Sequence, residues 1–309
     1  MSSTEYHRRE SLRQLAAETL RIIKVGGYRL TKSSHSLHTK QVQQDTTFHP
    51  PHTLSEWSLQ TYQSAHSQLA SISILEISTL SCARLLSSII RNNACIDTRI
   101  GVLNFASAVK PGGGFQNGAQ AQEESIARSS NLFPALKTET AQNFYEIHNS
   151  EPRNHFYTHS MIYSPGVEVF RDDDGTLTKP FRIDVLTSAA VNAHEVRQSP
   201  QAHLLGRTKT EEKIEFVMKE RMAQILFLFE RRGVRNLVLG SFGTGVFRND
   251  VGVVARIWAE LLAPGARFER SFDRVFFAIL GKRTFVDFGN AFNDRTHQRA
   301  SQPYRPYRA

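Results

Sequence analysis

The chain carries three consecutive glycines, Gly112 to Gly114, between an apolar segment and a segment with helical spacing. The apolar segment, 100–106, predicts a buried strand, and residues 119–129 predict a helix. Glycine has no Cβ atom, so a run of three is favoured where the backbone approaches another group closely. Backbone N–H groups beside the start of a helix attract anions. The triplet therefore predicts a strand–loop–helix unit whose loop binds an anion such as a diphosphate.

A second glycine loop, with Gly243, Thr244 and Gly245, lies late in the chain. It follows a predicted strand at 236–239 and precedes a predicted helix at 251–262. This loop therefore has the same strand–loop–helix form as the first. Together, the two loops are expected to hold one diphosphate from both sides.

Two common nucleotide-binding motifs do not fit this second loop. Its glycines, from Gly240 to Gly245, have the wrong spacing for a Rossmann fingerprint and lie far from a first βαβ unit. A Walker loop is excluded because no Gly-Lys-Ser/Thr sequence follows. A dinucleotide-dependent oxidoreductase is therefore not favoured.

Strands and helices alternate over most of the chain after residue 99. Such alternation is typical of an α/β sandwich around a mixed sheet. Expected strands lie at 100–106, 156–164, 167–170, 183–189, 236–239 and 274–280, and expected helices at 119–129, 210–231 and 251–262. Asn249 or Asp250 can cap the last of these helices.

The segment before this α/β region has a different character. Helical spacing predicts helices at 8–25 and 78–92, and Gly26-Gly27 ends the first. Residues 31–73 are rich in Ser, Thr, Gln and His and are expected to form a solvated loop or an accessory segment that wraps around the domain. We therefore divide the chain into an N-terminal helical accessory region with a polar loop (1–95), an α/β domain (96–290) and a basic flexible tail (291–309).

The charge balance indicates the kind of partner. The chain has 38 Lys and Arg against 29 Asp and Glu, a formal net charge of +9. An excess of this size suggests nucleic acid, phospholipid or another phosphate-rich polymer.

Cysteine content and hydropathy indicate the environment. The two cysteines, Cys82 and Cys95, provide no disulfide framework, and their spacing matches no zinc motif. No apolar run reaches the roughly 18 residues of a membrane-spanning helix, and the first residues lack the apolar core of a signal peptide. We therefore expect a soluble, intracellular protein, in the cytoplasm or nucleus, that binds no membrane.

Two adjacent glutamates, Glu123 and Glu124, lie near the start of the helix expected after the triplet. Acidic residues are common there because they interact favourably with the helix dipole. Beside an anion-binding loop, however, the pair becomes a candidate for acid–base chemistry. Two neighbouring carboxylates near a diphosphate raise the pKa of at least one of them, although the helix N-terminus acts in the opposite sense.

The residues around the triplet resemble a known signature. Pro111-Gly112-Gly113-Gly114, seven residues, and then Gln122-Glu123-Glu124 resemble the signature of poly(ADP-ribose) glycohydrolases. The flanking segments 104–107 and 125–130 are similar to the microbial-type branch, which is built on a macrodomain. Further agreement lies at 162–165, 170–172 and 186–192, in the second loop and in the two N-terminal helices, so the resemblance covers about residues 8–285.

The resemblance implies a macrodomain-like three-layer α/β sandwich with a mixed sheet, preceded by the N-terminal helical accessory region. It implies hydrolysis of the ribose–ribose O-glycosidic bonds of poly(ADP-ribose), with release of ADP-ribose, through an oxocarbenium-like transition state. In this family the last glutamate of the signature acts, so Glu124 would be the general acid and then the base for water. Glu123 would hold ribose hydroxyls. The resemblance implies no metal and no cofactor.

Further residues would bind the substrate if the resemblance holds. Backbone N–H groups of two sets of residues would hold the diphosphate: Gly112, Gly113 and Gly114, and Gly243, Thr244 and Gly245. Val246 and Phe247 would lie against the ribose next to the scissile bond. Asn104 and Gln122 are further candidates for substrate binding. The expected partners are poly(ADP-ribose), poly(ADP-ribosyl)ated proteins and the product ADP-ribose, and we expect a monomer.

Two alternatives remain open from the sequence. A mono-ADP-ribosyl hydrolase acting on protein or nucleic acid would use the same ADP-ribose pocket, so the sequence hardly separates it from polymer cleavage. A non-catalytic macrodomain that only binds ADP-ribose has no need of the Glu123–Glu124 pair, which favours an enzyme.

Overall fold

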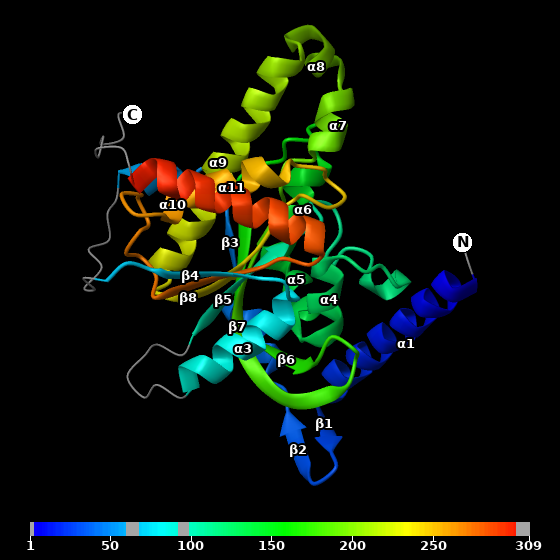
Figure 1. Ribbon diagram of the computed structural model, residues 1–309. Coiled ribbons are helices and arrows are strands. Elements are labelled where there is room, and N and C mark those ends of the chain that lie inside the picture. The colour runs from blue at the N-terminus through cyan, green and yellow to red at the C-terminus, as the bar shows by residue number, and fades with distance from the viewer. Residues whose placement is uncertain (1–2, 60–67, 92–98, 301–309) are drawn as a thin grey trace.

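The computed structural model describes residues 3–59, 68–91 and 99–300. At its centre lies a seven-stranded mixed sheet with helices on both faces (Figure 1). The strands are, in order across the sheet, β3 (Thr47–His49), β6 (Met161–Arg171), β7 (Leu177–Ser188), β5 (Ile100–Phe105), β8 (Asn236–Leu239), β9 (Arg274–Ala278) and β4 (Ser71–Leu75). The α/β fold around a mixed sheet, predicted from the sequence, is confirmed.

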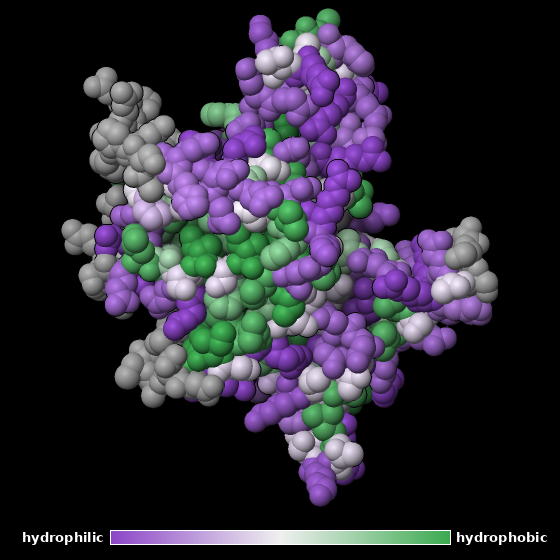
Figure 2. Space-filling model, in the orientation of Figure 1, coloured by the Kyte–Doolittle hydropathy of each residue, from purple (hydrophilic) through white to green (hydrophobic). Residues whose placement is uncertain are grey.

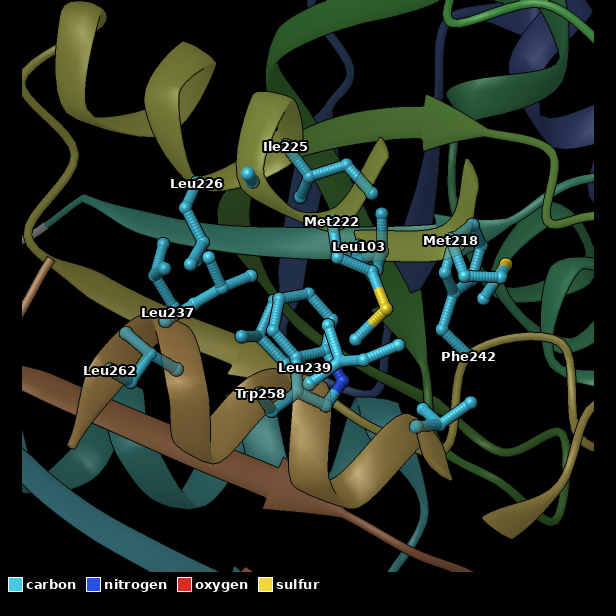
Figure 3. Close-up of a cluster of buried hydrophobic side chains, with 14 of the residues drawn as sticks. Leu103, Met218, Met222, Ile225, Leu226, Leu237, Leu239, Phe242, Trp258 and Leu262 are labelled. Carbon is cyan, nitrogen blue, oxygen red and sulfur yellow. The ribbon is translucent and has the colours of Figure 1, made fainter. Parts of the chain in front are cut away.

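One face of the sheet is covered by α9 (Arg207–Arg231), α10 (Val251–Leu262) and α11 (Lys282–Ala300). Leu237 and Leu239, two residues apart on β8, point to this face because alternate side chains of a strand share a side. They pack with Met222 of α9 and Trp258 of α10 in one buried cluster (Figure 3). This cluster forms the larger of the two core layers.

The opposite face is covered by α2 (Thr39–Asp45), α3 (Thr79–Arg91), α4 (Gln122–Ser129), α5 (Leu132–Leu136) and α6 (Glu139–Asn149). Val102 of β5 and Val238 of β8 pack here with Leu86 of α3. Cys82 belongs to this layer, and burial raises the pKa of its thiol to about 12. Cys95 lies outside the described residues.

Five neighbouring strands, β7, β5, β8, β9 and β4, run parallel to one another. Their carboxyl ends meet at one edge of the sheet, where open α/β proteins bind their ligands. The segment 106–121 follows β5 and the segment 240–250 follows β8, which is the strand beside it. The fold therefore brings the two glycine loops together at this edge.

Helix α1 (Ser3–Val25) lies outside the sandwich and contacts the segment that follows the glycine triplet (Figure 1). The guanidinium Nε of Arg9 donates to the carbonyl of Asn117, in the short 3-10 turn η2 (Phe115–Asn117). The Thr19 hydroxyl donates to the carbonyl of Arg128 near the end of α4, at 2.6 Å. The N-terminal helix thus holds both ends of this segment in place.

The described parts of the segment 31–73, residues 31–59 and 68–73, contain regular structure, although a solvated loop or an accessory wrap was expected from its composition. They complete a hairpin of β1 (Gly27–Leu30) and β2 (Ser33–Ser36) and then form α2, β3, the 3-10 turn η1 (Ser55–Ser58) and the start of β4. Strand β3 pairs with β6, and β4 pairs with β9. These two short polar segments become strands because they pair with partners that are distant in the chain. Their own local sequence therefore gives little indication of a strand.

The boundary predicted near residue 96 does not separate two structural units. Both edge strands of the sheet, β3 and β4, come from before it, and α3 packs on the face of the same sheet. The region predicted as accessory therefore completes the main core.

The last helix, α11, was not expected from the sequence. Residues 291–300, predicted to belong to a flexible tail, continue α11 to Ala300. Phe288 and Phe292, one helical turn apart, are buried against Phe277 of β9, with ring centroids 5.2 and 5.3 Å from it. This packing anchors the second half of the helix. The polar composition of the segment gave no indication of it.

Two further differences concern the middle of the chain. In place of the two strands expected at 156–164 and 167–170 there is a single strand, β6, which begins only at Met161 and is irregular between Ser164 and Val167. Two helices not expected from the sequence, α7 (Ala193–Gln198) and α8 (Pro200–Leu205), project from the body with the first part of α9 (Figure 1).

Surface hydropathy differs between this projection and the body. Figure 2 shows that the projection is mostly hydrophilic, whereas apolar residues gather below α11 on the face that carries β4 and α3. Among residues 3–59, 68–91 and 99–300, no helix is long and apolar enough to cross a bilayer.

Candidate active site

A pocket of about 530 Å³ opens at the carboxyl edge of the parallel strands. Its wall includes residues from the segments that follow β4, β5, β7, β8 and β9. Its volume lies within the roughly 300–1,000 Å³ of small-molecule sites. All five parallel strands therefore contribute to one binding site.

Most of the residues predicted for the site line this pocket. They are Gln122, Glu123, Glu124, Gly243, Thr244, Gly245, Val246 and Phe247. Asn104 and the triplet from Gly112 to Gly114 do not line it and instead adjoin the two glutamates.

Glu124 lies in the first turn of α4 and reaches the pocket wall, although only 8% of the residue is exposed. Its Oε1 atom accepts a hydrogen bond of 2.9 Å from the backbone N–H of Gly114. Gly113 approaches the same carboxylate so closely that a Cβ atom there would overlap Oε1. A glycine is therefore needed at position 113, where the loop passes this glutamate.

Glu123 is more deeply buried, with 2% of the residue exposed. Its Oε2 atom accepts a hydrogen bond of 2.7 Å from the backbone N–H of Ser107. Burial raises the pKa of Glu123 to about 8, and the charge of Glu124 acts in the same direction. Hydrogen bonds from Ser107, Asn104 and Gly112 lower this pKa but do not outweigh burial.

Two ionisable residues near the pair were not singled out from the sequence. Burial lowers the pKa of Arg128 on α4, and the nearby charge of Glu124 acts in the opposite direction. Burial raises the pKa of the Tyr145 phenol on α6 well above its usual value, and the charge of Glu123 adds to this. The i, i+4 spacing of Glu124 and Arg128 is a signal that could have identified Arg128. Tyr145 has no such signal, because it resembles any aromatic residue on a buried helix face.

Gln122 joins α4 to the end of β5. Its Nε2 atom donates to the carbonyl of Leu103 at 2.7 Å and to the Thr79 hydroxyl at 3.3 Å. Its Oε1 atom accepts from the N–H of Phe105 at 2.9 Å. Because its amide groups have protein partners, Gln122 orients the helix that carries the glutamates.

The N–H groups of the glycine triplet are used inside the protein. Gly113 donates to the carbonyl of Lys110 at 2.9 Å, Gly114 donates to Glu124, and Gly112 contributes to lowering the pKa of Glu123. This differs from the predicted role of the triplet in holding the diphosphate. Gly112 and Gly113 have φ angles of 67° and 57°, a left-handed backbone that favours glycine and that directs the loop toward the glutamates.

The second glycine loop retains N–H groups that could bind an anion. Thr244 does not supply one, because its N–H and its hydroxyl both donate to the carbonyl of Ser241. Within the described residues, the N–H groups of Gly243, Gly245, Val246 and Phe247 have no hydrogen-bond acceptor, and these residues line the pocket. Adjacent free N–H groups of this kind form an anion-binding concavity.

Val246 and Phe247 differ sharply in their surroundings. Val246 is 80% exposed at the outer end of the loop. Phe247 is half-buried, packs against the main core and lies 6.0 Å from the ring of Tyr157, centroid to centroid. The aromatic ring therefore has a defined position on the pocket wall.

Asn104 is fully buried at the end of β5. Its Nδ2 atom donates to the Thr187 hydroxyl on β7 at 3.1 Å, and its amide helps to lower the pKa of Glu123. Asn104 therefore lies behind the glutamate pair, at the base of the site.

The fold and the site together define a class of enzyme. Two adjacent carboxyl groups on the wall of a pocket suit acid–base cleavage of a glycosidic bond. The free N–H groups in the same pocket suit a phosphate-containing substrate. In the described ranges, no group of three or more His, Cys, Asp or Glu side chains is placed to hold a metal ion.

Comparison with family models identifies the family. Residues 16–172 match the model described as microbial-type PARG, catalytic domain. The chain belongs to this family, as the resemblance of its signature predicted.

Solved structures of bacterial enzymes agree with this assignment. Poly(ADP-ribose) glycohydrolase from Thermomonospora curvata is 36% identical, with a TM-score of 0.81 over 93% of this chain and 100% of that chain. The same enzyme bound to the inhibitor ADP-HPD gives 37% identity and a TM-score of 0.78 over the same shares. The Deinococcus radiodurans enzyme in complex with ADP-ribose is 30% identical, with a TM-score of 0.71 over 88% and 99% of the two chains. A comparison with curated protein sequences gave no match.

Proposed function

We propose that this chain hydrolyses the ribose–ribose O-glycosidic bonds of poly(ADP-ribose) and releases ADP-ribose. The observation that carries the proposal is the position of Glu124, which lines the pocket and is held there by the Gly114 N–H. The structures of the Thermomonospora curvata enzyme with ADP-HPD and of the Deinococcus radiodurans enzyme with ADP-ribose support an ADP-ribose unit as the ligand. Poly(ADP-ribosyl)ated proteins are the proposed source of the polymer.

In this mechanism Glu124 acts first as an acid and then as a base. Its carboxyl proton passes to the 2′-oxygen of the leaving ribose while the bond from that oxygen to the anomeric carbon breaks. The anomeric carbon becomes oxocarbenium-like. A water oxygen then bonds to this carbon, and Glu124 takes back a proton from that water. The products are ADP-ribose and a polymer that is one unit shorter.

The surroundings of Glu124 suit both steps. The Gly114 N–H and the nearby guanidinium of Arg128 stabilise the carboxylate that remains after proton transfer. With a pKa of about 8, Glu123 is mostly protonated at neutral pH. It therefore adds little negative charge beside the diphosphate, and its carboxyl group can hydrogen-bond to ribose hydroxyls.

The second loop is the proposed site of the diphosphate. Its free N–H groups at Gly243, Gly245, Val246 and Phe247 can bind an anion through the backbone alone, with no charged side chain required. The Phe247 ring, which lines the same pocket, is then placed to contact the ribose beside the scissile bond. In this arrangement the first glycine loop positions the carboxyl groups, and the second holds the phosphates.

A parallel assay tests this proposal. The purified protein and its Glu124→Gln variant are each incubated with poly(ADP-ribosyl)ated protein and with mono-ADP-ribosylated protein, and released ADP-ribose is measured. We expect the wild-type protein to shorten the polymer, and the variant to lose activity by about 100- to 10,000-fold. Calorimetry should show little change in ADP-ribose affinity. Release from the mono-modified target alone, or undiminished polymer cleavage by the variant, would overturn the proposal.

A further inference from the structure

Two residues other than glycine have a left-handed backbone among those described, and both adjoin Phe247. Arg248, with φ 53°, follows it in the chain, and Tyr157, with φ 54°, packs its ring against the Phe247 ring. Side chains are rare in this region of φ because the Cβ atom meets the backbone. Such conformations persist only where surrounding contacts hold them, and they concentrate at functional sites.

Helix α7 supplies the contacts that hold the segment at Phe247. The N–H of His194 donates to the carbonyl of Phe247 at 3.0 Å. The Nη1 atom of Arg197 donates to the carbonyl of Arg248 at 2.8 Å. Two successive carbonyls of the loop are thus tied to one short helix.

Arg197 is itself fixed by α9. Its Nε and Nη2 atoms donate to the two carboxylate oxygens of Glu211, at 2.7 and 2.9 Å. A forked pair of this geometry fixes the guanidinium plane, so its remaining nitrogen can be aimed at one acceptor. Asp250, the N-cap of α10, also contributes favourable charge near Arg197. Arg197 therefore joins α7, α9 and the loop after β8.

We propose that Arg197 is a positioning residue for the reaction, which holds Phe247 against the ribose through the carbonyl of Arg248. This inference rests on the proposed function. Without this bond, the left-handed backbone of Arg248 loses a contact that maintains it. The Phe247 ring can then leave the position in which it contacts the sugar, although Glu124 and the free N–H groups remain.

The expected effect is on turnover more than on binding. A displacement of about 1 Å at a reacting centre can lower the rate by about 100-fold. ADP-ribose affinity should change less, because N–H groups of the loop other than that of Phe247 still bind the diphosphate. Arg197→Gln and Glu211→Gln should each lower kcat by about tenfold or more with little change in KM. The double variant should be no worse than Arg197→Gln alone, since both changes break the same chain of contacts.

Arg235→Gln serves as the matched control. Arg235 also makes two short hydrogen bonds to one carboxylate, that of Asp273, but it precedes β8 at the opposite edge of the sheet. We expect this variant to keep the wild-type kcat. Arg197→Lys keeps the positive charge but not the fork, so it should retain part of the activity that Arg197→Gln loses.

Hydrogen exchange supplies a readout that does not depend on catalysis. Arg197→Gln should speed amide exchange across residues 243–250, whereas Arg235→Gln should not. Unchanged exchange there, or a loss of kcat no larger than that of Arg235→Gln, would overturn the inference. If the wild-type protein releases no ADP-ribose but the exchange result holds, the proposed function fails while the positioning contact stands.

Discussion

The backbone N–H of Gly114 donates a hydrogen bond of 2.9 Å to Oε1 of Glu124, ten residues farther along the chain. This bond crosses from the loop after β5 to the first turn of α4. The loop and the glutamate therefore orient one another. A change in the backbone of the loop should alter the chemistry of the site even where no side chain of the site is replaced.

Gly113→Ala tests this dependence. Gly113 has φ 57°, and an added Cβ would overlap the Glu124 carboxylate. We expect kcat on polymer to fall by about tenfold or more because the carboxylate is displaced. The left-handed backbone should add a loss of about 1–2 kcal/mol in unfolding free energy. Steady-state kinetics and urea unfolding measure the two effects.

Gly166→Ala is the control for backbone strain alone. Gly166 also has a left-handed backbone, φ 69°, but nothing lies within 4 Å of its added Cβ. It should lose a similar amount of stability and keep its turnover. Equal losses of kcat in the two variants would contradict a role of Gly113 in placing Glu124.

The raised pKa of Glu123 predicts a pH dependence of stability. Its pKa is about 8 in the folded protein against an ordinary glutamate value of 4.5, so between these pH values the folded state holds the proton and the unfolded state does not. This contribution to stability is complete below about pH 4.5 and is lost as pH rises through 8. The slope is about 1.4 kcal/mol per pH unit at most.

Glu123→Gln should remove this contribution because an amide does not titrate in this range. In urea unfolding from pH 5 to pH 9, the unfolding free energy of the variant is expected to increase relative to that of the wild type as pH rises. A constant difference between the two proteins across the interval would show that Glu123 is ionised throughout.

Phe247→Ala should separate function from packing. Because Phe247 is half-buried, we expect a loss of about 1 kcal/mol in unfolding free energy but a fall in kcat of about tenfold or more. Phe292→Ala in α11 provides the comparison, since that ring is buried against Phe277 and far less exposed. It should lose about 3–5 kcal/mol and keep its turnover at temperatures where it is folded. A large loss of stability with unchanged kcat in Phe247→Ala would show that Phe247 contributes only to core packing.

Thr19→Val tests the attachment of the N-terminal helix. The Thr19 hydroxyl donates to the carbonyl of Arg128 and accepts from Nε of Arg171 at 3.0 Å, and both contacts are buried. Valine has nearly the same shape but leaves these partners unsatisfied, so we expect a loss of about 1–3 kcal/mol. Thr296→Val in α11, whose hydroxyl bonds only within its own helix, should change unfolding free energy by less than about 0.5 kcal/mol.

Parts of the fold that carry their own pattern could be predicted from the sequence. The strand at 236–239 and the helix at 251–262 were predicted with their observed bounds. The Asp250 carboxylate caps that helix by accepting from the N–H of Val253 at 2.8 Å. Strands β3 and β4 were missed because distant strands supply their hydrogen bonds. Helix α11 was missed because one buried aromatic face stabilises an otherwise polar helix.

The site was predictable in its residue types but not in its hydrogen bonds. The spacing of the triplet and the glutamates led to the correct family and to residues that line one pocket. The acceptors of the triplet N–H groups depend on the φ angles of Gly112 and Gly113, which no sequence pattern specifies. The contact of Arg197 with Arg248 depends on α7 and α9 meeting in space, and neither residue belongs to a motif.

The pairing of β4 with β9 has a consequence for how this chain folds during synthesis. Ser71 lies opposite Arg274, so the pair joins segments about 200 residues apart. Strand β4 is synthesised first and has no pairing partner until β9, about 200 residues later, has also left the ribosome. Contacts between residues so far apart in the sequence slow folding. Until they form, the unpaired strand can pair with other chains. Aggregation during expression should therefore fall when translation is slowed by low temperature or when a chaperone covers the nascent chain.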